Sequence, residues 1–221
     1  MAKKVQTPET DILVESKGKI ETFFDKFGNK LMWGLVAVTV IAVGIFIWYN
    51  YSESKQEELN LNAQTEFIEL QNQQMMDIAA DDATYAASYV AIAEKYEGAT
   101  VVPMCYYMAG VLYLQAGDLD SAKANLDKVT EIEGDYGQLI NATVLKLQGD
   151  IAVEQKDYQT AVSYFEDALE VSANADIYGD VAIKLGLTYE ALGEGNKAQE
   201  IYEKAIEEYP SLQSVMAEFI K

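Results

Sequence analysis

The sequence predicts an all-α protein with a single transmembrane helix near its N-terminus, followed by a solenoid of helical hairpins. Three observations lead to this prediction. Residues 31–52 contain no charged side chain, and a motif recurs every 37 to 39 residues in the remainder of the chain. Polar, Gly- or Asp-bearing turns divide the apolar stretches of each copy. We therefore expect a cytoplasmic head with a short amphipathic helix (1–30), a transmembrane helix (31–52) and a repeat domain (53–221).

The uncharged segment 31–52 is long enough to cross a bilayer as a helix. Its 22 residues span about 33 Å at 1.5 Å per residue, against a hydrocarbon core of about 30 Å. Trp33 lies at one edge, and Trp48 and Tyr49 at the other, where aromatic rings settle at headgroup level. A buried core helix is the alternative, but such helices rarely stay uncharged for this length. A cleaved signal peptide has a shorter apolar region followed by small residues, so we predict an uncleaved signal anchor.

The distribution of lysine predicts the orientation of this anchor. Six Lys precede the segment and only Lys55 follows it within 20 residues. Positively charged flanks stay in the cytoplasm, so the N-terminus should be cytoplasmic and the repeat domain should lie outside. In a bacterium with two membranes, this places a single-pass protein in the inner membrane with its C-terminal domain in the periplasm.

The head contains an apolar stripe with helical spacing just before the anchor. Gly28-Asn29 should interrupt the helix between the head and the span. We expect the head helix to lie on the cytoplasmic membrane surface, with packing against the cytoplasmic loops of a partner as the alternative. The expected anchor and interface residues are Phe23, Phe24, Phe27, Trp33, Trp48 and Tyr49.

The charge of the chain excludes several functions. It has 36 acidic and 16 basic residues, every basic residue is Lys, and the net charge is −20. An acidic surface repels nucleic acid, so no nucleic-acid partner is expected. Without Arg there is no bidentate clamp for phosphate or carboxylate. Two interpretations of this acidity remain open. The charge keeps the domain soluble, or it gives the domain a preference for basic client segments.

The sequence contains no constellation typical of catalysis or of cofactor binding. It has no His, no Gly-rich phosphate loop, no GxSxG elbow and no HExxH motif. Cys105 is the only cysteine, which excludes an internal disulfide, a cysteine metal cluster and a Cys–His pair. Its apolar neighbours predict a buried structural thiol. We therefore expect no enzymatic activity, no cofactor and no metal site.

Three stretches of the chain align, beginning at Met104, Thr143 and Asp180. In each, an Ala follows a Gly by twelve residues, and a large apolar residue follows four positions later. These triplets are Gly110, Ala122 and Leu126; Gly149, Ala161 and Phe165; and Gly186, Ala198 and Tyr202. The pattern resembles the tetratricopeptide repeat, in which small residues let two antiparallel helices approach closely. Steps longer than the 34-residue consensus predict longer loops between repeats.

With a degenerate copy around Ala86, the domain should hold about three and a half tetratricopeptide-like repeats, and the tail SLQSVMAEFIK should cap its end. In this type of repeat the first helix of each pair lines the concave face, which binds partners. By their offsets in the motif, the residues expected in this groove are Met104, Tyr107, Val111, Thr143, Lys146, Asp150, Asp180, Ile183 and Leu187. The alternative is that the protein's own tail fills part of the groove.

The predicted layout is a head with FFDKFGNKL (Phe23 to Leu31), one anchor and an outer helical-repeat domain. This layout resembles that of the ancillary subunit of the bacterial Sec translocon. The resemblance covers the whole layout. It implies Sec channel subunits and a membrane-anchored periplasmic chaperone as partners, and emerging unfolded exported chains as clients. The sequence departs from the family by its acidity, its lack of Arg and its longer repeat steps.

The resulting hypothesis is a non-enzymatic, membrane-anchored scaffold or chaperone-adaptor at the Sec protein-export channel. It would bind partner chaperones or emerging exported chains through its repeat domain. An assembly or scaffolding factor of another cell-envelope complex is the first alternative. A regulator that senses the envelope through the anchor is the second.

Overall fold

The computed structural model describes residues 8–77, 81–172 and 174–220, with side chains described from residue 40 onward. The chain divides into two compact units, Met1–Glu57 and Glu58–Lys221, and each is described by itself. Helix α1 (Pro8–Met76) extends through the boundary between them. It also runs through Gly28 and Asn29, where the sequence predicted an interruption.

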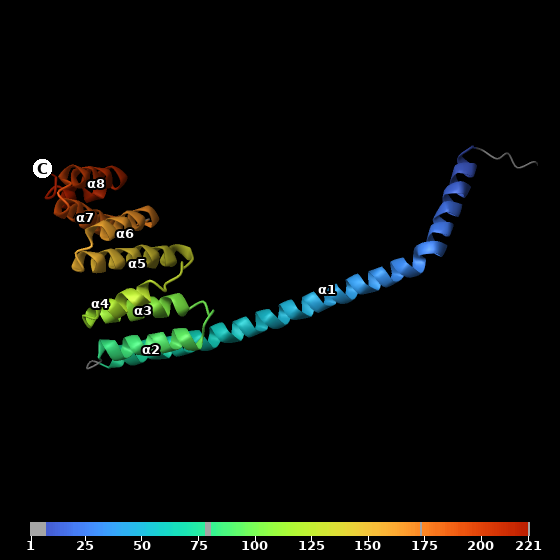
Figure 1. Cartoon of the computed structure of the whole chain (residues 1–221), viewed down its shortest axis with the longest axis horizontal. Helices are drawn as coiled ribbons and strands as arrows, with labels where there is room; N and C mark the ends of the chain where they lie inside the picture. Colours follow the sequence, from blue (N-terminus) through green and yellow to red (C-terminus); the bar gives the residue numbers. More distant parts are fainter. Residues whose placement is uncertain (1–7, 78–80, 173, 221) are drawn as a thin grey trace, which may run out of the picture. The chain divides into compact units, whose positions relative to one another are not determined.

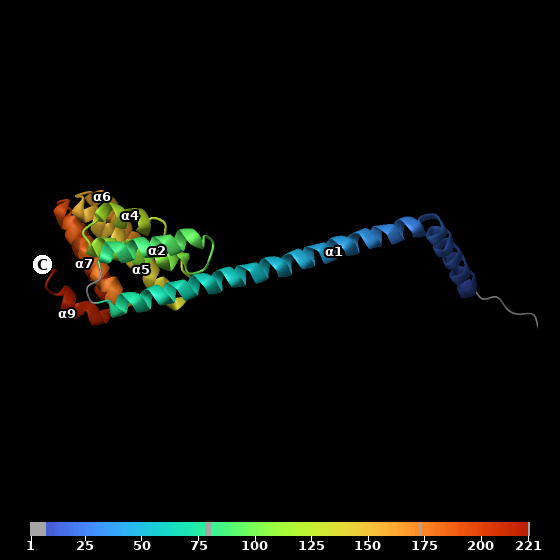
Figure 2. The ribbon, with the colours of Figure 1, turned by 90° about the horizontal axis from the view of Figure 1, so that it is seen from below.

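The second unit is a stack of antiparallel helix pairs, visible as successive layers in Figure 1. The end of α1 pairs with α2 (Asp82–Lys95), and α3 (Val102–Gln115) pairs with α4 (Leu119–Leu126). The next pairs are α5 (Gly134–Glu154) with α6 (Tyr158–Val171), and α7 (Ala175–Ala191) with α8 (Gly195–Glu208). The second helices α2, α4 and α6 lie along one side of the stack (Figure 2). This confirms the predicted all-α repeat solenoid, and the described residues contain no strand.

The turn inside each of the last three repeats has the same backbone geometry. Its central residue has a left-handed conformation, with φ of 79° at Gly117, 60° at Lys156 and 78° at Gly193. In two turns the following aspartate caps the next helix: Asp118 accepts a hydrogen bond from the Ser121 amide, and Asp157 accepts one from the Thr160 amide. Replacing such a capping residue by alanine typically lowers stability by about 1 kcal/mol. Asp118 and Asp157 therefore stabilise their hairpins.

The recurring glycines allow the two helices of each hairpin to touch. A Cβ atom built on each glycine would fall inside the large side chain sixteen positions later. The distances are 2.7 Å for Gly110 to Leu126 Cδ2, 2.4 Å for Gly149 to Phe165 Cε1, and 2.3 Å for Gly186 to Tyr202 Cε1. The repeat motif is therefore a packing device in which a missing side chain on one helix receives a large one from the other.

The C-terminal segment closes the last hairpin. After α8, the short helices η1 (Pro210–Leu212) and α9 (Gln213–Met216) fold back on the stack. Met216 is fully buried, and the Phe219 ring lies 5.4 Å from that of Tyr202. These contacts cover the apolar face that a further repeat would otherwise cover.

The second repeat departs from the regular pattern. Helix α4 has 8 residues, whereas α6 and α8 have 14 each. The loop 127–133 then leads to α5, as the long step predicted. At the next junction the prediction of a longer loop is wrong, because only residues 172–174 separate α6 from α7. There the additional residues lengthen the start of α7, which has 17 residues, whereas α3 has 14.

Candidate functional site

The nine residues predicted to line the groove lie on α3, α5 and α7, the first helices of successive pairs. All are at least partly accessible to solvent. The structure brings the members on α5 and α7 together through direct contacts. The members on α3 contact mainly the apolar core, so the set does not form one uniform surface.

Two ion pairs join α5 to α7. Lys146 Nζ lies 2.9 Å from Asp180 Oδ2, and Lys184 Nζ lies 2.8 Å from Asp150 Oδ1. Lys146 and Asp150 are one turn apart on α5, and Asp180 and Lys184 are one turn apart on α7, so the charges match crosswise. Each pair is partly exposed and contributes about 0–1 kcal/mol to stability. Their main consequence is a fixed register between neighbouring repeats.

The predicted groove residues on α3 are partly used by the fold itself. Met104 and Tyr107 pack against the cluster that contains Leu126, Ile140 and Val144. Burial, with a smaller contribution from Tyr136, raises the pKa of Tyr107. On α5, the Thr143 hydroxyl donates to the Leu139 carbonyl of its own helix, at 2.8 Å. On α3, Val111 is half-buried.

Two small hollows flank the Asp150–Lys184 ion pair. One has a volume of about 330 Å³ and is lined by Tyr158, Phe165 and Leu187 as well as the pair. The other, of about 370 Å³, lies toward Leu114 and Leu119. Leu187 is 46% exposed, whereas Ile183 packs against the C-terminal core cluster. This part of the predicted groove can receive one or two apolar side chains beside a charged pair.

The described residues of the C-terminal tail, up to residue 220, line neither of these hollows. Among the described residues after α8, Leu212 and Met216 are buried against the last hairpin instead. Phe219 and Ile220 also pack against the C-terminal core cluster. The two hollows are therefore open in this structure.

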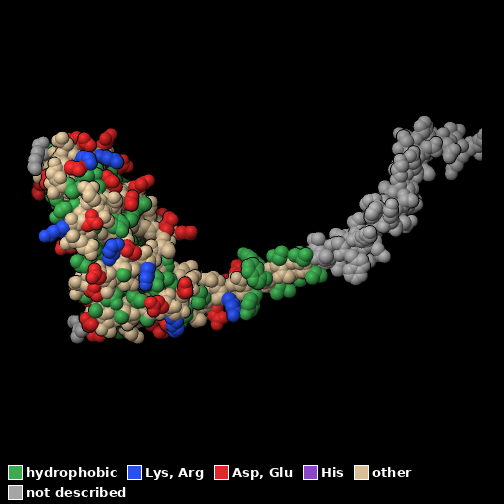
Figure 3. Space-filling view, in the orientation of Figure 1, with side chains coloured by type: hydrophobic (Ala, Val, Ile, Leu, Met, Phe, Trp, Pro, Cys, Tyr) green, Lys and Arg blue, Asp and Glu red, His purple; other side chains and the backbone are tan. Residues whose placement is uncertain are grey.

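The predicted anchor residues fall partly outside the described side chains. This is the case for Phe23, Phe24, Phe27 and Trp33, and for positions 31–39 of the predicted span. Trp48 and Tyr49 are 69% and 59% exposed. Among the residues with described side chains, none of the helices is sufficiently long and apolar to cross a membrane. Figure 3 shows hydrophobic side chains gathered on the first described turns of α1.

Sequence reasoning missed two groups of residues at this surface. The first is Lys184, which was not assigned to the groove. Along α5 a Lys precedes an Asp by four residues (Lys146, Asp150), and along α7 an Asp precedes a Lys by four (Asp180, Lys184), so this opposite order was a signal for the two ion pairs. The other group centres on Asn141, whose side-chain amide holds the backbone of Ile132. Nδ2 donates to the Ile132 carbonyl at 2.9 Å, and Oδ1 accepts from the Ile132 amide at 3.1 Å. A side chain that binds backbone nine residues away leaves no periodic signal.

The only cysteine is buried in the helix stack. Cys105 is fully buried, and burial raises the pKa of its thiol to about 12. The thiolate is the reactive form, so this side chain is unreactive at neutral pH. In the part of the chain that the structure describes, no group of three His, Cys, Asp or Glu residues could hold a metal ion.

Comparison with known proteins identifies the repeat. A family model described as a tetratricopeptide repeat-like domain matches residues 21–220. Two solved structures of MamA are 23% and 17% identical to this chain. The first match covers 57% of this chain and 67% of the MamA chain, and the second covers 72% of this chain and 75% of the MamA chain. Each has a TM-score of 0.47. The C-terminal part of a TPR repeat-containing protein from Cytophaga hutchinsonii is 13% identical, covers 67% of this chain and 65% of its own, and has a TM-score of 0.37. No curated protein matches the chain.

Proposed function

The chain belongs to the tetratricopeptide repeat-like domain family, and on this premise we propose that it is a membrane-anchored scaffold or chaperone-adaptor at the bacterial Sec export channel. Domains of this family act as scaffolds for protein–protein interactions. In the proposal, the protein is not an enzyme, and its repeat domain lies on the periplasmic side of the inner membrane. There it binds partner chaperones or emerging exported chains.

The observation that carries the proposal is the exposed apolar segment 40–51 of α1. It contains no charged residue, and its large hydrophobic side chains are between 50% and 69% exposed. All positions of the segment are exposed, so the apolar surface surrounds the helix. An apolar surface of this kind is unfavourable in water, at about 25 cal/mol per Å². Lipid would cover it on every side, as the predicted span 31–52 requires.

Two features of the sequence support the position at the export channel. The six Lys before the span favour a cytoplasmic N-terminus. The head sequence from Phe23 to Leu31 resembles that of the ancillary translocon subunit. The helical stack supports the proposal as a repeat domain with hollows for partner side chains beside the Asp150–Lys184 pair.

A photo-crosslinking scan in cells tests the proposal. Probes at Val40 and Trp48 report on the neighbours of the anchor, and a probe at Leu187 reports on the groove. A probe at Glu207, which is exposed on α8, serves as the control position. We expect anchor crosslinks to Sec channel subunits or to a membrane-anchored chaperone, and groove crosslinks to a chaperone or a newly exported chain. Crosslinks to another envelope complex, with the channel absent, would show that the proposal is wrong.

A further inference from the structure

Two large hollows lie along the edge of the solenoid where the connections between repeats run. We call them the first and second loop-edge hollows. The first has a volume of about 1000 Å³ and lies between the α2–α3 connection and the loop 127–133. The second, of about 800 Å³, lies between the same loop, α5 and the end of α6. Neither contains any of the nine residues predicted for the groove.

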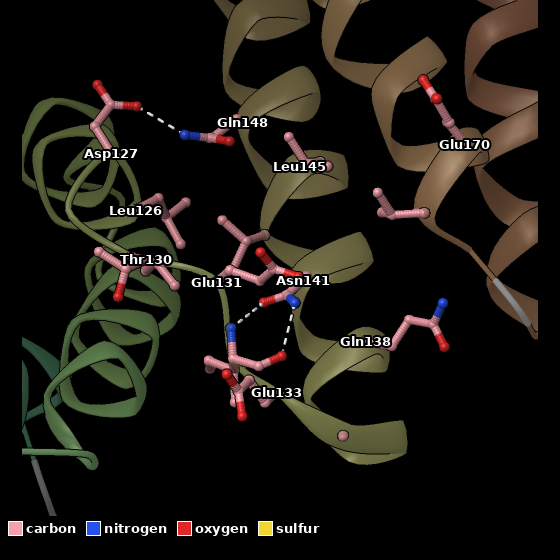
Figure 4. Close-up of a pocket in the computed structure, with 15 residues that line it drawn as sticks. Leu126, Asp127, Thr130, Glu131, Glu133, Gln138, Asn141, Leu145, Gln148 and Glu170 are labelled. Carbon is pink, nitrogen blue, oxygen red and sulfur yellow. Dashed lines mark hydrogen bonds between the residues drawn. The ribbon is translucent and has the colours of Figure 1, made fainter. Parts of the chain in front are cut away.

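The short helix α4 explains why these hollows exist. It ends six residues earlier than α6 and α8 do, a difference of about 9 Å along a helix axis. The loop 127–133, which begins with a turn at residues 127 and 128, crosses this space and leaves room on both sides. Figure 4 shows the second hollow, with Gln148 on α5 directed toward Asp127 at the start of the loop and Gln138 directed away from the loop.

The loop is held in place by side chains of α5. Asn141 makes both of its hydrogen bonds to Ile132, and Gln148 Nε2 donates to Asp127 Oδ1 at 2.8 Å. Gly137 lies directly under the loop, because a Cβ atom there would be 2.2 Å from the Ile132 carbonyl oxygen. The border between the two hollows is therefore built into the fold, and a ligand would not have to order it.

The first hollow combines an apolar wall with an acidic rim. Val102, Pro103, Tyr106 and Ile132 line the wall. Among the described residues, six carboxylates line the two hollows together, against a single ammonium group. The carboxylates belong to Glu94, Glu97, Asp127, Glu131, Glu133 and Glu170. Residues 51–221 as a whole carry 31 acids and 10 Lys, so the hollows are more acidic than an already acidic domain.

This ammonium group shows how a cation fits the first hollow. Lys128 Nζ lies over the ring of Tyr106, 5.0 Å from its centroid. Burial raises the pKa of the Tyr106 hydroxyl, and the nearby Glu94 and Glu97 raise it further. An aromatic face together with carboxylates is a favourable environment for a lysine or arginine side chain. The chain fills this position with the end of its own long lysine side chain.

We propose that the first loop-edge hollow binds an apolar polypeptide segment that carries lysine or arginine, and that the cation of this segment replaces Lys128 against Tyr106. The wall of Val102, Pro103 and Ile132 would contact the apolar side chains of the segment. The rim glutamates would attract its positive charge. This inference rests on the proposed function and deepens it, because it names the chemistry of one client segment and adds a contact site for it beside the concave groove.

Peptide binding to the full chain in nanodiscs of zwitterionic lipid tests this site. The probe is a labelled twelve-residue peptide with three Leu and three Lys among Gly and Ser, and the comparison peptide has Glu in place of Lys. We expect the Lys peptide to bind and the Glu peptide not to bind. We also expect binding to weaken with salt, because the charges of the rim are near the surface.

Variants locate the binding. The double variant Glu97→Gln and Glu133→Gln should weaken binding of the Lys peptide about tenfold. Lys128→Ala should strengthen it several-fold, because the competing ammonium is removed. The matched control Glu203→Gln with Glu207→Gln removes two charges from α8, and Glu154→Gln removes one beside the groove. Both should leave the affinity unchanged, and thermal melts check that every variant is folded.

The site is overturned if the Lys peptide fails to bind. It is also overturned if the α8 control weakens binding as much as the rim variant, or if only Glu154→Gln weakens it. The crosslinking scan tests the position at the export channel independently of this site. Channel crosslinks without peptide binding would remove only this site, and peptide binding without channel crosslinks would remove only the proposed location.

Discussion

Helix α3 and segment 40–51 of α1 are both helical and both free of charged residues, yet their surroundings are opposite. In α3, Gln115 is the only exposed residue, and Cys105, Ala109 and Leu112 are almost completely buried. In segment 40–51 every residue is exposed. The chain therefore supplies the cover for one apolar helix and leaves the other without cover among the described residues.

This difference indicates what each apolar sequence is for. In α3, helices α2 and α4 bury the apolar residues, and the recurring glycines allow the close approach. Segment 40–51 has no glycine paired with a large residue, and the space around Gly44 is empty. Lipid can cover such a surface without shape complementarity. The surface of segment 40–51 therefore suits the lipid environment that we propose for it.

The largest expected effect is on the uncovered helix. In the proposed span, Ile41→Lys replaces a residue that favours the membrane with one that opposes it, at a cost of about 3 to 4 kcal/mol. The carbonate-resistant fraction of the full chain in isolated membranes should fall sharply, while Ile41→Leu should leave it unchanged. If the lysine variant stays in the membrane fraction to the same extent, segment 40–51 is not the part of the chain that lipid covers.

The second prediction concerns the covered helix. Leu112 is 3% exposed, and Leu112→Ala should lower the free energy of unfolding of the repeat unit by about 3 kcal/mol. Ile45 is 61% exposed, so Ile45→Ala should change it by less than about 0.5 kcal/mol. Urea denaturation followed by circular dichroism measures both. Equal losses in the two variants would mean that segment 40–51 has cover within the protein.

The third prediction concerns the glycines that bring the helices together. Gly149→Ala should destabilise the repeat unit by about 1 to 3 kcal/mol, because its Cβ would overlap the rigid ring of Phe165. Gly110→Ala should cost less, because Leu126 can rotate. Gly195→Ala is the control, since nothing lies within 4 Å of its Cβ position in α8. A thermal melt in which Gly195→Ala is the most damaging of the three would refute this explanation of the motif.

These glycines also show which parts of the fold could be predicted from the sequence. The Gly, Ala and large-residue pattern predicts the helix pairs and their turns, because each pairing is local and recurs. The long step from Gly110 to Gly149 predicted a longer loop after α4, but the shortness of α4 itself was not predicted, because the repeat pattern continues through it. The clamp from Asn141 to Ile132 depends on tertiary contact, and so do the hollows beside it. The crosswise pairing of Lys184 with Asp150 depends on how two repeats stack.

The fourth prediction concerns the turns that connect the covering helices. Lys156 has a φ of 60°, in the left-handed region where the equivalent turns have Gly117 and Gly193. A side chain in this conformation costs about 1 kcal/mol, so Lys156→Gly should raise the urea midpoint. The reverse change at the equivalent position, Gly193→Lys, should lower it by a similar amount. A fall with Lys156→Gly would mean that the lysine makes a contact that outweighs the strain.

The smallest effect is on the part of α1 that the repeat unit does cover. Glu66 is paired with Lys95 and accepts a hydrogen bond from the Tyr96 hydroxyl at 2.7 Å. Lys95 first and Tyr96 second lower the pKa of this carboxyl. A lowered pKa stabilises the fold above the unfolded value of about 4.3, and this stabilisation is lost as the pH falls through the folded value. Glu66→Gln should therefore be less stable than the native chain at pH 7, and the difference should disappear in acid. A difference that is the same at pH 7 and pH 3 would contradict this.

The most direct test of the account is the topology of the full chain in the membrane of a bacterium with two membranes. Protease is added to intact cells, to spheroplasts and to lysed spheroplasts, and the repeat unit is followed with an antibody. We expect the chain to sediment with membranes and resist carbonate, and the repeat unit to be digested in spheroplasts but not in intact cells. A chain that is released by carbonate, or a repeat unit that is protected until the spheroplasts are lysed, would contradict the proposed anchored scaffold.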